Sequence, residues 1–346
     1  MTRKVKIACL PVAGIGNPFQ YLMIQGLNTN ETLHAYSGNK NRLIGIFLTA
    51  ISSFPDYIHF DWIDSLYARR NKVLMLINAI AFLFQIYVCK YIFRIKIVAT
   101  LHNIKPHDAK NLHLHFFIYK QFLKCCIKIR VFSNTTIAAA SKYYDINTNK
   151  FFVIPEGSFV NYYPNNKSKA ESRKTLELPD DAFIFLFLGN IRPYKGIQAL
   201  LDIYKASEIK DSILIIAGNS PDKAYLEKIQ KQTNTSIIIK PGFITTENVQ
   251  LFYNAANIVV LPFTEVENSG SAILAMGFEK AVIAPKKGVL SERLSEQPEL
   301  LYNDGELGLT LKHAAVLSEL ELKKIGQRNA KHLGKYQWED FCAFFI

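Results

Sequence analysis

Two segments in the second half of the chain carry residues suited to binding a diphosphate. The first follows the apolar run Phe183–Leu188, which predicts a buried strand. It places Arg192 and Lys195 three residues apart where the strand gives way to a helix. Two cations at such a position can neutralise a diphosphate. The segment is completed by Gly189, Asn190 and Gly196.

The second segment follows another strand-like run, Ile258–Leu261. It combines two carboxylates with small polar residues at the start of a predicted helix, namely Glu265, Glu267, Asn268, Ser269, Gly270 and Ser271. Backbone N–H groups at a helix start can bind phosphate, and a carboxylate can accept hydrogen bonds from sugar hydroxyls. Together the two segments predict a nucleotide-sugar site. The alternatives are surface cations after a strand and an ordinary helix N-cap.

The order of these motifs resembles GT-B glycosyltransferases of the glycogen-synthase-like superfamily. Gly-x-x-Arg-x-x-Lys-Gly at 189–196, Pro-Phe-x-Glu at 262–265 and Ala-Val-Ile-Ala at 281–284 are similar to its carboxy-terminal half. Residues 16–20 and 100–108 resemble a bacterial subgroup that builds capsular and exopolysaccharides, including β-mannosyltransferases acting on lipid-linked saccharides. The resemblance implies an α/β fold with two Rossmann-like domains and an interdomain cleft.

The chain departs from this family at one position. The family's second glutamate, on the helix before Ala-Met, corresponds to Leu274. A retaining mechanism therefore does not follow from the resemblance. The same departure motivates a different hypothesis, a non-catalytic partner subunit that keeps the fold.

The length of 346 residues and the 49% hydrophobic composition favour two domains over one core. We expect an acceptor-binding domain over residues 1–160, a linker over 161–181 and a nucleotide-sugar domain over 182–334. In the family, a terminal segment, here 335–346, packs back on the first domain. The predicted strands are Val5–Leu10, Tyr57–Phe60, Ile95–Leu101, Ile129–Phe132, Phe151–Ile154, Phe183–Leu188, Ile213–Ala217, Ser236–Ile239, Ile258–Leu261 and Ala281–Ala284, and a helix is predicted over Ala315–His332.

The positive charge is concentrated in the first half of the chain. Residues 1–150 carry 19 Lys and Arg against 6 Asp and Glu, or +13, whereas residues 151–346 carry 22 against 23, or −1. This asymmetry favours an anionic membrane surface as partner, or a general bias toward lysine. Nucleic acid is not expected, because no binding motif accompanies the charge. The apolar stretch Val73–Cys89, which basic residues flank, and the segment Phe116–Arg130, which has the basic and apolar pattern of an interfacial helix, are candidates for contact with a membrane surface. A core helix is the alternative for both segments and is the favoured interpretation for Val73–Cys89.

Candidate bases and acceptor ligands lie in the first half. Asp61 follows a predicted strand and is our first candidate for the general base, with His102 and His107 as further candidates. His102 and Asn103 follow another strand and are candidate acceptor ligands. Gly16 and Asn17 lie in the loop after the first strand, where backbone can approach a ligand.

No cofactor or metal is expected, because Asp61 and Asp64 do not form an Asp-x-Asp motif. The odd number of cysteines, five, argues against a disulfide scaffold and favours the cytoplasm. Together with the basic first half of the chain, this predicts a peripheral protein at the inner face of the membrane. The sequence therefore predicts a hexosyltransferase acting on a lipid-linked saccharide, with mannose from GDP-mannose as first choice. A retaining enzyme that uses a UDP-sugar is the alternative within the fold.

Overall fold

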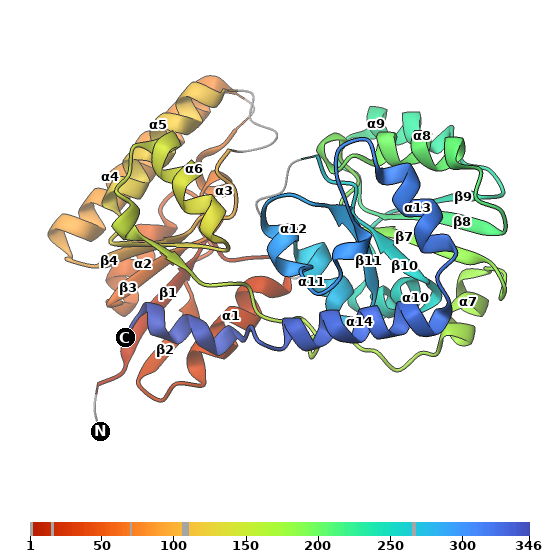
Figure 1. Cartoon of the computed structure of the whole chain (residues 1–346). Helices are drawn as coiled ribbons and strands as arrows, with labels where there is room; N and C mark the ends of the chain where they lie inside the picture. Colours follow the sequence, from red (N-terminus) through yellow and green to blue (C-terminus); the bar gives the residue numbers. More distant parts are fainter. Residues whose placement is uncertain (1–2, 15–16, 70, 106–110, 265–267) are drawn as a thin grey trace. The chain divides into compact units, whose positions relative to one another are not determined.

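The computed structural model of the chain describes residues 3–14, 17–69, 71–105, 111–264 and 268–346. The chain forms two compact units. The first comprises residues 1–157 and 337–346, and the second comprises residues 158–336. Each unit contains a six-stranded sheet with helices packed around it (Figure 1).

The sheet of the first unit has the strand order β2-β1-β3-β4-β5-β6, and neighbouring strands run parallel. Parallel strands need crossover connections, which helices provide here. The strands are β1 (Val5–Leu10), β2 (Leu33–Ser37), β3 (Tyr57–Phe60), β4 (Lys96–Thr100), β5 (Lys128–Val131) and β6 (Phe151–Val153). The helices are α1 (Pro18–Asn28), α2 (Gly45–Ser53), α3 (Asp64–Tyr67), α4 (Lys72–Tyr87), α5 (Leu112–Cys125) and α6 (Asn134–Tyr144), with a π-helical segment η1 (Val88–Ile92) and a 3₁₀ turn η2 (Thr148–Lys150).

The sheet of the second unit has the order β12-β11-β10-β7-β8-β9, again with parallel neighbours. Its strand β8 is buried along its whole length, as expected for a parallel sheet covered on both faces. The strands are β7 (Phe183–Leu188), β8 (Ser212–Gly218), β9 (Ile237–Pro241), β10 (Ile258–Val260), β11 (Ala281–Pro285) and β12 (Leu301–Tyr302). The helices are α7 (Lys169–Leu176), α8 (Ile197–Ser207), α9 (Lys223–Gln230), α10 (Thr246–Ala255), α11 (Gly270–Gly277), α12 (Gly288–Arg293), α13 (Leu307–Ala315) and α14 (Glu319–Leu333), with 3₁₀ turns η3 (Pro193–Lys195) and η4 (Pro298–Leu300).

The segment 161–181, expected to be a linker, is folded into the second unit. It contains α7, which begins at a capping box formed by Ser168 and Glu171. Arg173 on this helix is buried and donates hydrogen bonds to five oxygens: the backbone carbonyls of Pro179, Asp180, Ala182 and Ala255 and the Asn257 side chain. A guanidinium satisfied in this way fixes the segment against β7 and α10.

The end of the chain belongs to the first unit. The 3₁₀ segment η5 (Trp338–Phe344) packs against α1 (Figure 1). A Cβ atom placed on Gly26 would lie 2.5 Å from Trp338, and one on Gly157 would lie 2.7 Å from it. Glycine at both positions therefore allows Trp338 to pack this closely.

Two helical predictions are wrong in detail. The predicted helix Ala315–His332 corresponds to α14, but α14 begins only at Glu319, because Ser318 is its N-cap and forms a capping box with Glu321. Ala315 is the last residue of α13. The segment Phe116–Arg130 is not one interfacial helix, because α5 ends at Cys125 and β5 follows. The apolar side of α5 is in the core through Ile118, Phe122 and Leu123.

Candidate active site

The two predicted phosphate-binding segments meet at one edge of the second sheet. β7 and β10 are neighbours, with Phe185 opposite Ile258, so the loops that follow them leave the same edge. The Thr264 hydroxyl donates a hydrogen bond to the backbone carbonyl of Tyr194 at 3.0 Å, which joins the two loops. Glu265 and Glu267 lie outside the described residues.

Gly189 allows the loop after β7 to pass close to its neighbours. Its φ of +154° and its contact with Ser271, whose Oγ would lie 3.2 Å from an added Cβ, favour glycine. Gly218 at the end of β8 is tighter still, because a Cβ there would lie 1.9 Å from the Gly189 carbonyl oxygen. Asn190 follows Gly189 and is exposed. The start of α11 is thereby packed against the end of β7.

Arg192 is the N-cap of the short turn η3, and Lys195 is the last residue of that turn. The Lys195 ammonium lies 3.9 Å from the centre of the Phe263 ring, which comes from the loop after β10. Burial, together with the charge of Arg192, lowers the pKa of Lys195 to about 8. A bound anion would relieve the repulsion between these two cations, so the arrangement suits a diphosphate.

The start of α11 has a side-chain N-cap. Ser269 Oγ accepts a hydrogen bond from the Ala272 N–H at 3.1 Å, and the Ser269 N–H donates to Asn268 Oδ1 at 2.9 Å. The N-cap interpretation of Ser269 is therefore confirmed. The first-turn N–H groups, those of Gly270 and Ser271 among them, have no carbonyl partner within an ideal helix and can serve an anion.

In the first unit, Asp61 lies at the end of β3 and is buried. Its Oδ1 lies 3.0 Å from His102 Nε2, its Oδ2 accepts a hydrogen bond from Gln20 Nε2 at 3.4 Å, and His59 Nδ1 lies 3.7 Å from Oδ2. His59 Nε2 is in turn 2.8 Å from the Thr100 hydroxyl. The sequence did not identify His59, Gln20 or Thr100, because their contacts join β3, α1 and β4.

The protonation of this cluster follows from its burial. Burial alone would raise the pKa of the Asp61 carboxyl, but the opposing influence of His59, His102 and Arg130 outweighs it and holds the pKa below its usual range. Burial lowers the pKa of His59 to about 4. Asp61 is thus a carboxylate near neutral pH and His59 is neutral. A buried carboxylate with a lowered pKa is a weak base.

His102, at the end of β4, is held by aromatic rings. It stacks on Trp62, with ring centres 4.1 Å apart and planes 21° apart, and the ring of Phe19 approaches it edge-on at 4.9 Å. The Asp61 contact engages Nε2, and the imidazole remains 9% exposed. Asp61 and the two aromatic side chains therefore fix the orientation of the imidazole, which sequence reasoning could not anticipate.

His102 and Asn103 line a small cavity of about 30 Å³ together with Asp61. A cavity of this size has room for roughly one water molecule. His107 and Gly16, the remaining predicted site residues of the first unit, lie outside the described part of the chain.

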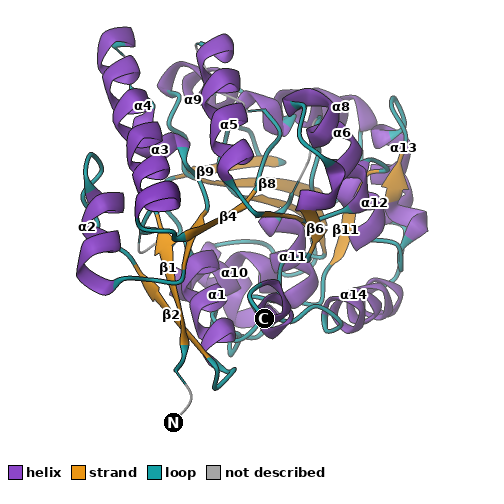
Figure 2. Cartoon of the chain, turned by 90° about the vertical axis from the view of Figure 1, so that its left-hand side faces the viewer, coloured by secondary structure: helices purple, strands orange, loops and turns teal. Residues whose placement is uncertain are grey.

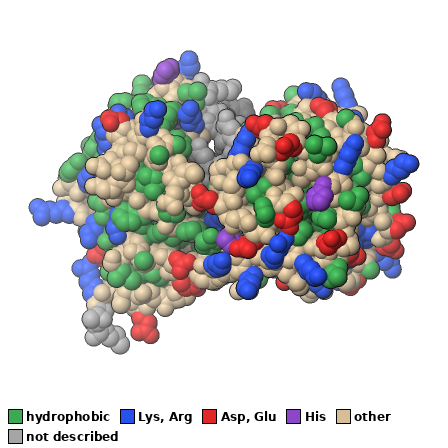
Figure 3. All heavy atoms as spheres, in the orientation of Figure 1, with side chains coloured by type: hydrophobic (Ala, Val, Ile, Leu, Met, Phe, Trp, Pro, Cys, Tyr) green, Lys and Arg blue, Asp and Glu red, His purple; other side chains and the backbone are tan. Residues whose placement is uncertain are grey.

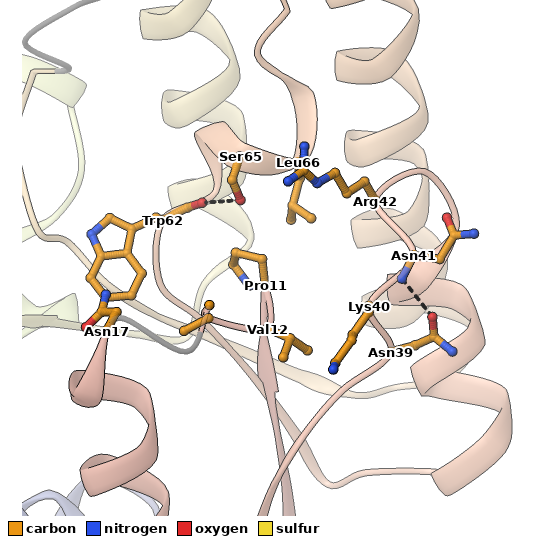
Figure 4. Close-up of a pocket in the computed structure, with 12 residues that line it drawn as sticks. Pro11, Val12, Asn17, Asn39, Lys40, Asn41, Arg42, Trp62, Ser65 and Leu66 are labelled. Carbon is orange, nitrogen blue, oxygen red and sulfur yellow. Dashed lines mark hydrogen bonds between the residues drawn. The ribbon is translucent and has the colours of Figure 1, made fainter. Parts of the chain in front are cut away.

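A larger pocket of about 270 Å³ lies beside this cavity, with Trp62 lining both (Figure 4). Asn17, predicted to bind the acceptor, lines this pocket, and its Oδ1 also caps α1 by accepting from the Phe19 N–H at 3.1 Å. Lys40 and Arg42 line the opposite side, from the loop between β2 and α2. Sequence reasoning missed both cations because it did not predict β2.

All five cysteines are buried, and none is paired with another. Within the described part of the chain, no three His, Cys, Asp or Glu side chains are grouped as a metal site would require.

Comparison with known proteins agrees with this architecture. Residues 168–298 match the family of glycosyl transferases group 1. A Salmonella typhimurium lipopolysaccharide 1,2-N-acetylglucosaminetransferase is 26% identical over 279 residues, which cover 72% of this chain and 65% of that protein. A Xanthomonas campestris GDP-mannose:glycolipid 4-beta-D-mannosyltransferase is 25% identical over 247 residues, covering 68% and 63%. The chain thus spans somewhat less than two thirds of the length of these relatives.

Among solved structures, Anabaena Alr3699/HepE in complex with UDP and glucose superimposes with a TM-score of 0.71 at 16% identity, covering 99% of this chain and 98% of that one. The second unit therefore carries a glycosyl transferases group 1 domain. The chain as a whole has the two-domain GT-B fold.

Proposed function

We propose that this protein is a glycosyltransferase that moves a hexose from a nucleotide sugar to a lipid-linked saccharide. The observation that carries the proposal is the meeting of the loops after β7 and β10, in which Lys195 lies against Phe263 and Gly189 lies against Ser271 in the first turn of α11. Charge develops on a departing nucleoside diphosphate during transfer. Fixed cations and backbone N–H groups stabilise that charge without rearranging.

His102 is the better candidate for the general base, and Asp61 is its positioning residue. Asp61 is buried and holds its proton weakly, so it accepts the proton of an acceptor hydroxyl poorly. With Nε2 engaged by Asp61, the second ring nitrogen of His102 is the one that would take that proton. The acceptor oxygen then bonds to the anomeric carbon as the bond from that carbon to the diphosphate breaks. Inversion at the anomeric carbon is the outcome of this route.

GDP-mannose remains the first choice of donor. It rests on the resemblance of the upstream motifs and on a relative that is a GDP-mannose:glycolipid mannosyltransferase. A UDP-sugar is the second candidate, favoured by the structural similarity to a protein solved with UDP and glucose.

The pocket lined by Asn17, Lys40 and Arg42 is our candidate acceptor site, because its two cations suit an anionic acceptor.

A thermal-shift screen of nucleotide sugars tests the donor assignment, since a ligand that binds the folded state raises its apparent stability. We expect GDP-mannose to raise Tm and UDP-sugars to raise it less. A larger shift with a UDP-sugar would replace mannose by the alternative. Nucleotide binding without transfer to any lipid-linked saccharide would instead favour a non-catalytic subunit, the hypothesis raised by Leu274.

A further inference from the structure

Helix α4 is apolar on two sides, and only one of them is in the core. Its buried side chains recur at intervals of four and three residues: Met75, Ala79, Phe82, Ile86 and, in η1, Cys89. This spacing marks one side of a helix. These residues belong to the hydrophobic core of the first unit. This side of α4 is therefore already buried by packing within the protein.

A second apolar stripe runs along the exposed side of the same helix. Its members recur with the same spacing, and most are more than half exposed: Val73 (65%), Ile77 (53%), Ile80 (61%), Phe84 (66%), Tyr87 (38%) and Tyr91 (63%). Leu74, Leu76 and Ile92 are also exposed. A row of large apolar side chains of this length is unusual on a protein surface that meets only water.

Helix α2 extends this surface. Its exposed side carries Ile44, Phe47, Ile51 and Phe54, again at intervals of three and four residues. Gln85 on α4 joins the two helices, because its Nε2 donates to the Leu43 carbonyl at 2.7 Å and its Oε1 accepts from the Phe47 N–H at 3.1 Å. α2 and α4 lie along one edge of the first unit in Figure 2. We call the exposed stripes of α2, α4 and η1 the apolar face.

The charges around the apolar face are of one sign. The sequence contains no Asp or Glu from Thr32 to Pro55 or from Ser65 to Lys105. Exposed cations flank the face at Lys40 and Arg42 before α2, at Lys72 where α4 begins, and at Arg94 after η1. In Figure 3, acidic side chains are concentrated on the visible face of the second unit instead.

We propose that the apolar face docks on the surface of an anionic lipid bilayer, with the exposed side chains of α2 and α4 in the interfacial layer and the flanking cations against lipid phosphates. A helix with an apolar face and flanking cations binds such surfaces through buried area and electrostatic attraction together. A second copy of this chain is the less suitable occupant, because pairing two such faces would bring like charges together.

The helix lies on the membrane and does not cross it. Lys72–Ile92 is 21 residues long, and its most apolar window has a mean hydropathy of 1.9, so length and composition alone would allow a span. However, 39% of that window is buried inside the protein, through the stripe that contains Phe82 and Ile86. Insertion across a bilayer would require this stripe to leave the core of the first unit.

Co-sedimentation of the full chain with vesicles tests the proposal. At low salt we expect binding to vesicles that contain phosphatidylglycerol, weaker binding to pure phosphatidylcholine, and a decrease at 1 M salt, where the Debye length falls to about 3 Å. The variant Ile77→Gln, Ile80→Gln, Phe84→Gln should bind at least about tenfold more weakly, since each change removes exposed apolar area. Because these side chains are exposed, the variant should keep the wild-type Tm.

The second unit offers a matched control. Leu309, Val316 and Leu320 are 71%, 80% and 61% exposed, so replacing all three by Gln removes comparable apolar surface elsewhere. This variant should bind vesicles as the wild type does. Equal binding by the α4 variant, or no binding of the wild type to anionic vesicles, would overturn the proposal. So would sedimentation showing a wild-type dimer that the α4 variant abolishes while vesicles are not bound.

The inference shares with the proposed function only the premise of a membrane-anchored acceptor, and the two can fail separately. Vesicle binding is measured without donor or acceptor, whereas the nucleotide thermal shift needs no lipid. If a nucleotide sugar raises the Tm but the protein does not co-sediment with anionic vesicles, the docking face alone is contradicted. If the protein co-sediments with anionic vesicles but no nucleotide sugar raises its Tm, the proposed function alone is contradicted.

Discussion

Gly196 lies so close to Pro262 that a Cβ on the glycine would stand 1.9 Å from the proline carbonyl oxygen. Gly196 also has φ +71°, in the left-handed region. The two residues belong to the loops after β7 and β10, so their contact sets the spacing of the candidate donor site.

Replacing Gly196 with Ala should therefore lower the free energy of unfolding by more than the roughly 1–2 kcal/mol that the left-handed conformation alone costs an L-residue. Chemical denaturation measures the change. Gly305→Ala is the control, because Gly305 has φ +86° but no atom within 4 Å of an added Cβ. Equal losses for the two variants would mean that the close approach to Pro262 costs nothing.

Replacing Arg192 or Lys195 with Ala should reduce transfer by about 10²-fold or more, as expected for a preorganised group that stabilises developing charge. Neither change should prevent folding, which circular dichroism would verify. Lys174→Ala on α7, which removes an exposed cation from the same unit, should leave turnover unchanged. Normal turnover in a folded double variant would remove these residues from the mechanism.

Nucleotide affinity should depend on pH through Lys195, whose pKa is lowered to about 8. The protonated amine attracts the diphosphate, so the affinity contributed by this group is present below pH 8 and is lost above it, by up to about tenfold per pH unit. Titration calorimetry with GDP or UDP from pH 7 to 9.5 measures this. In Lys195→Arg the decrease should vanish over this range, because a guanidinium stays protonated. An identical decrease in that variant would assign the titration elsewhere.

The roles of Asp61 and His102 can be separated by rate and affinity. His102→Gln should lower the transfer rate by about 10²-fold or more, within the range for loss of a general base. Asp61→Asn should lower it less, because the imidazole remains while its orientation is weakened. Donor affinity should change little in either variant. A larger loss from Asp61→Asn would return the role of base to the carboxylate, and an NMR spectrum showing retained anomeric configuration would exclude an inverting base.

His59 should make the protein sensitive to acid. Its folded pKa is about 4, whereas an unfolded histidine has a pKa near 6.5. The unfolded state therefore binds the proton first as the pH falls, and up to about 3 kcal/mol of stability is lost between pH 6.5 and 4. Denaturation across this range should show a smaller loss for His59→Gln than for the wild type. His34→Gln, at an exposed position, should behave as the wild type does.

Strands that consist of a clear apolar run could be predicted with the correct first and last residues, as β1, β3 and β7 were. β2 was missed because Leu33–Ser37 mixes polar and apolar residues without a long run, and Lys40 and Arg42 were missed with it. Residue spacing was sufficient to place Arg192 and Lys195 after a strand. It was insufficient to show that Phe263, from a different loop, lies under the Lys195 ammonium.

Burial was the quantity that the sequence could not supply. Asp61 was expected to act as a base because it follows a strand, but the protonation state favoured there depends on neighbours from β4 and α1. The same limit applies to α4. A helix that is apolar all round gives no periodic signal for which side faces the core, so only the fold distinguishes Phe82, which is buried, from Phe84, which is exposed.

The return of the chain to the first unit has a consequence for synthesis. Phe341 in η5 is fully buried and lies with its ring centre 4.4 Å from the guanidinium of Arg130, in the first half of the chain. A ribosome releases residues 337–346 only after the whole second unit has been made. The first unit therefore stays incompletely folded, with part of its core exposed, while the second unit can complete its fold. Pulse proteolysis of stalled nascent chains should show the unit nearer the N-terminus becoming protected last.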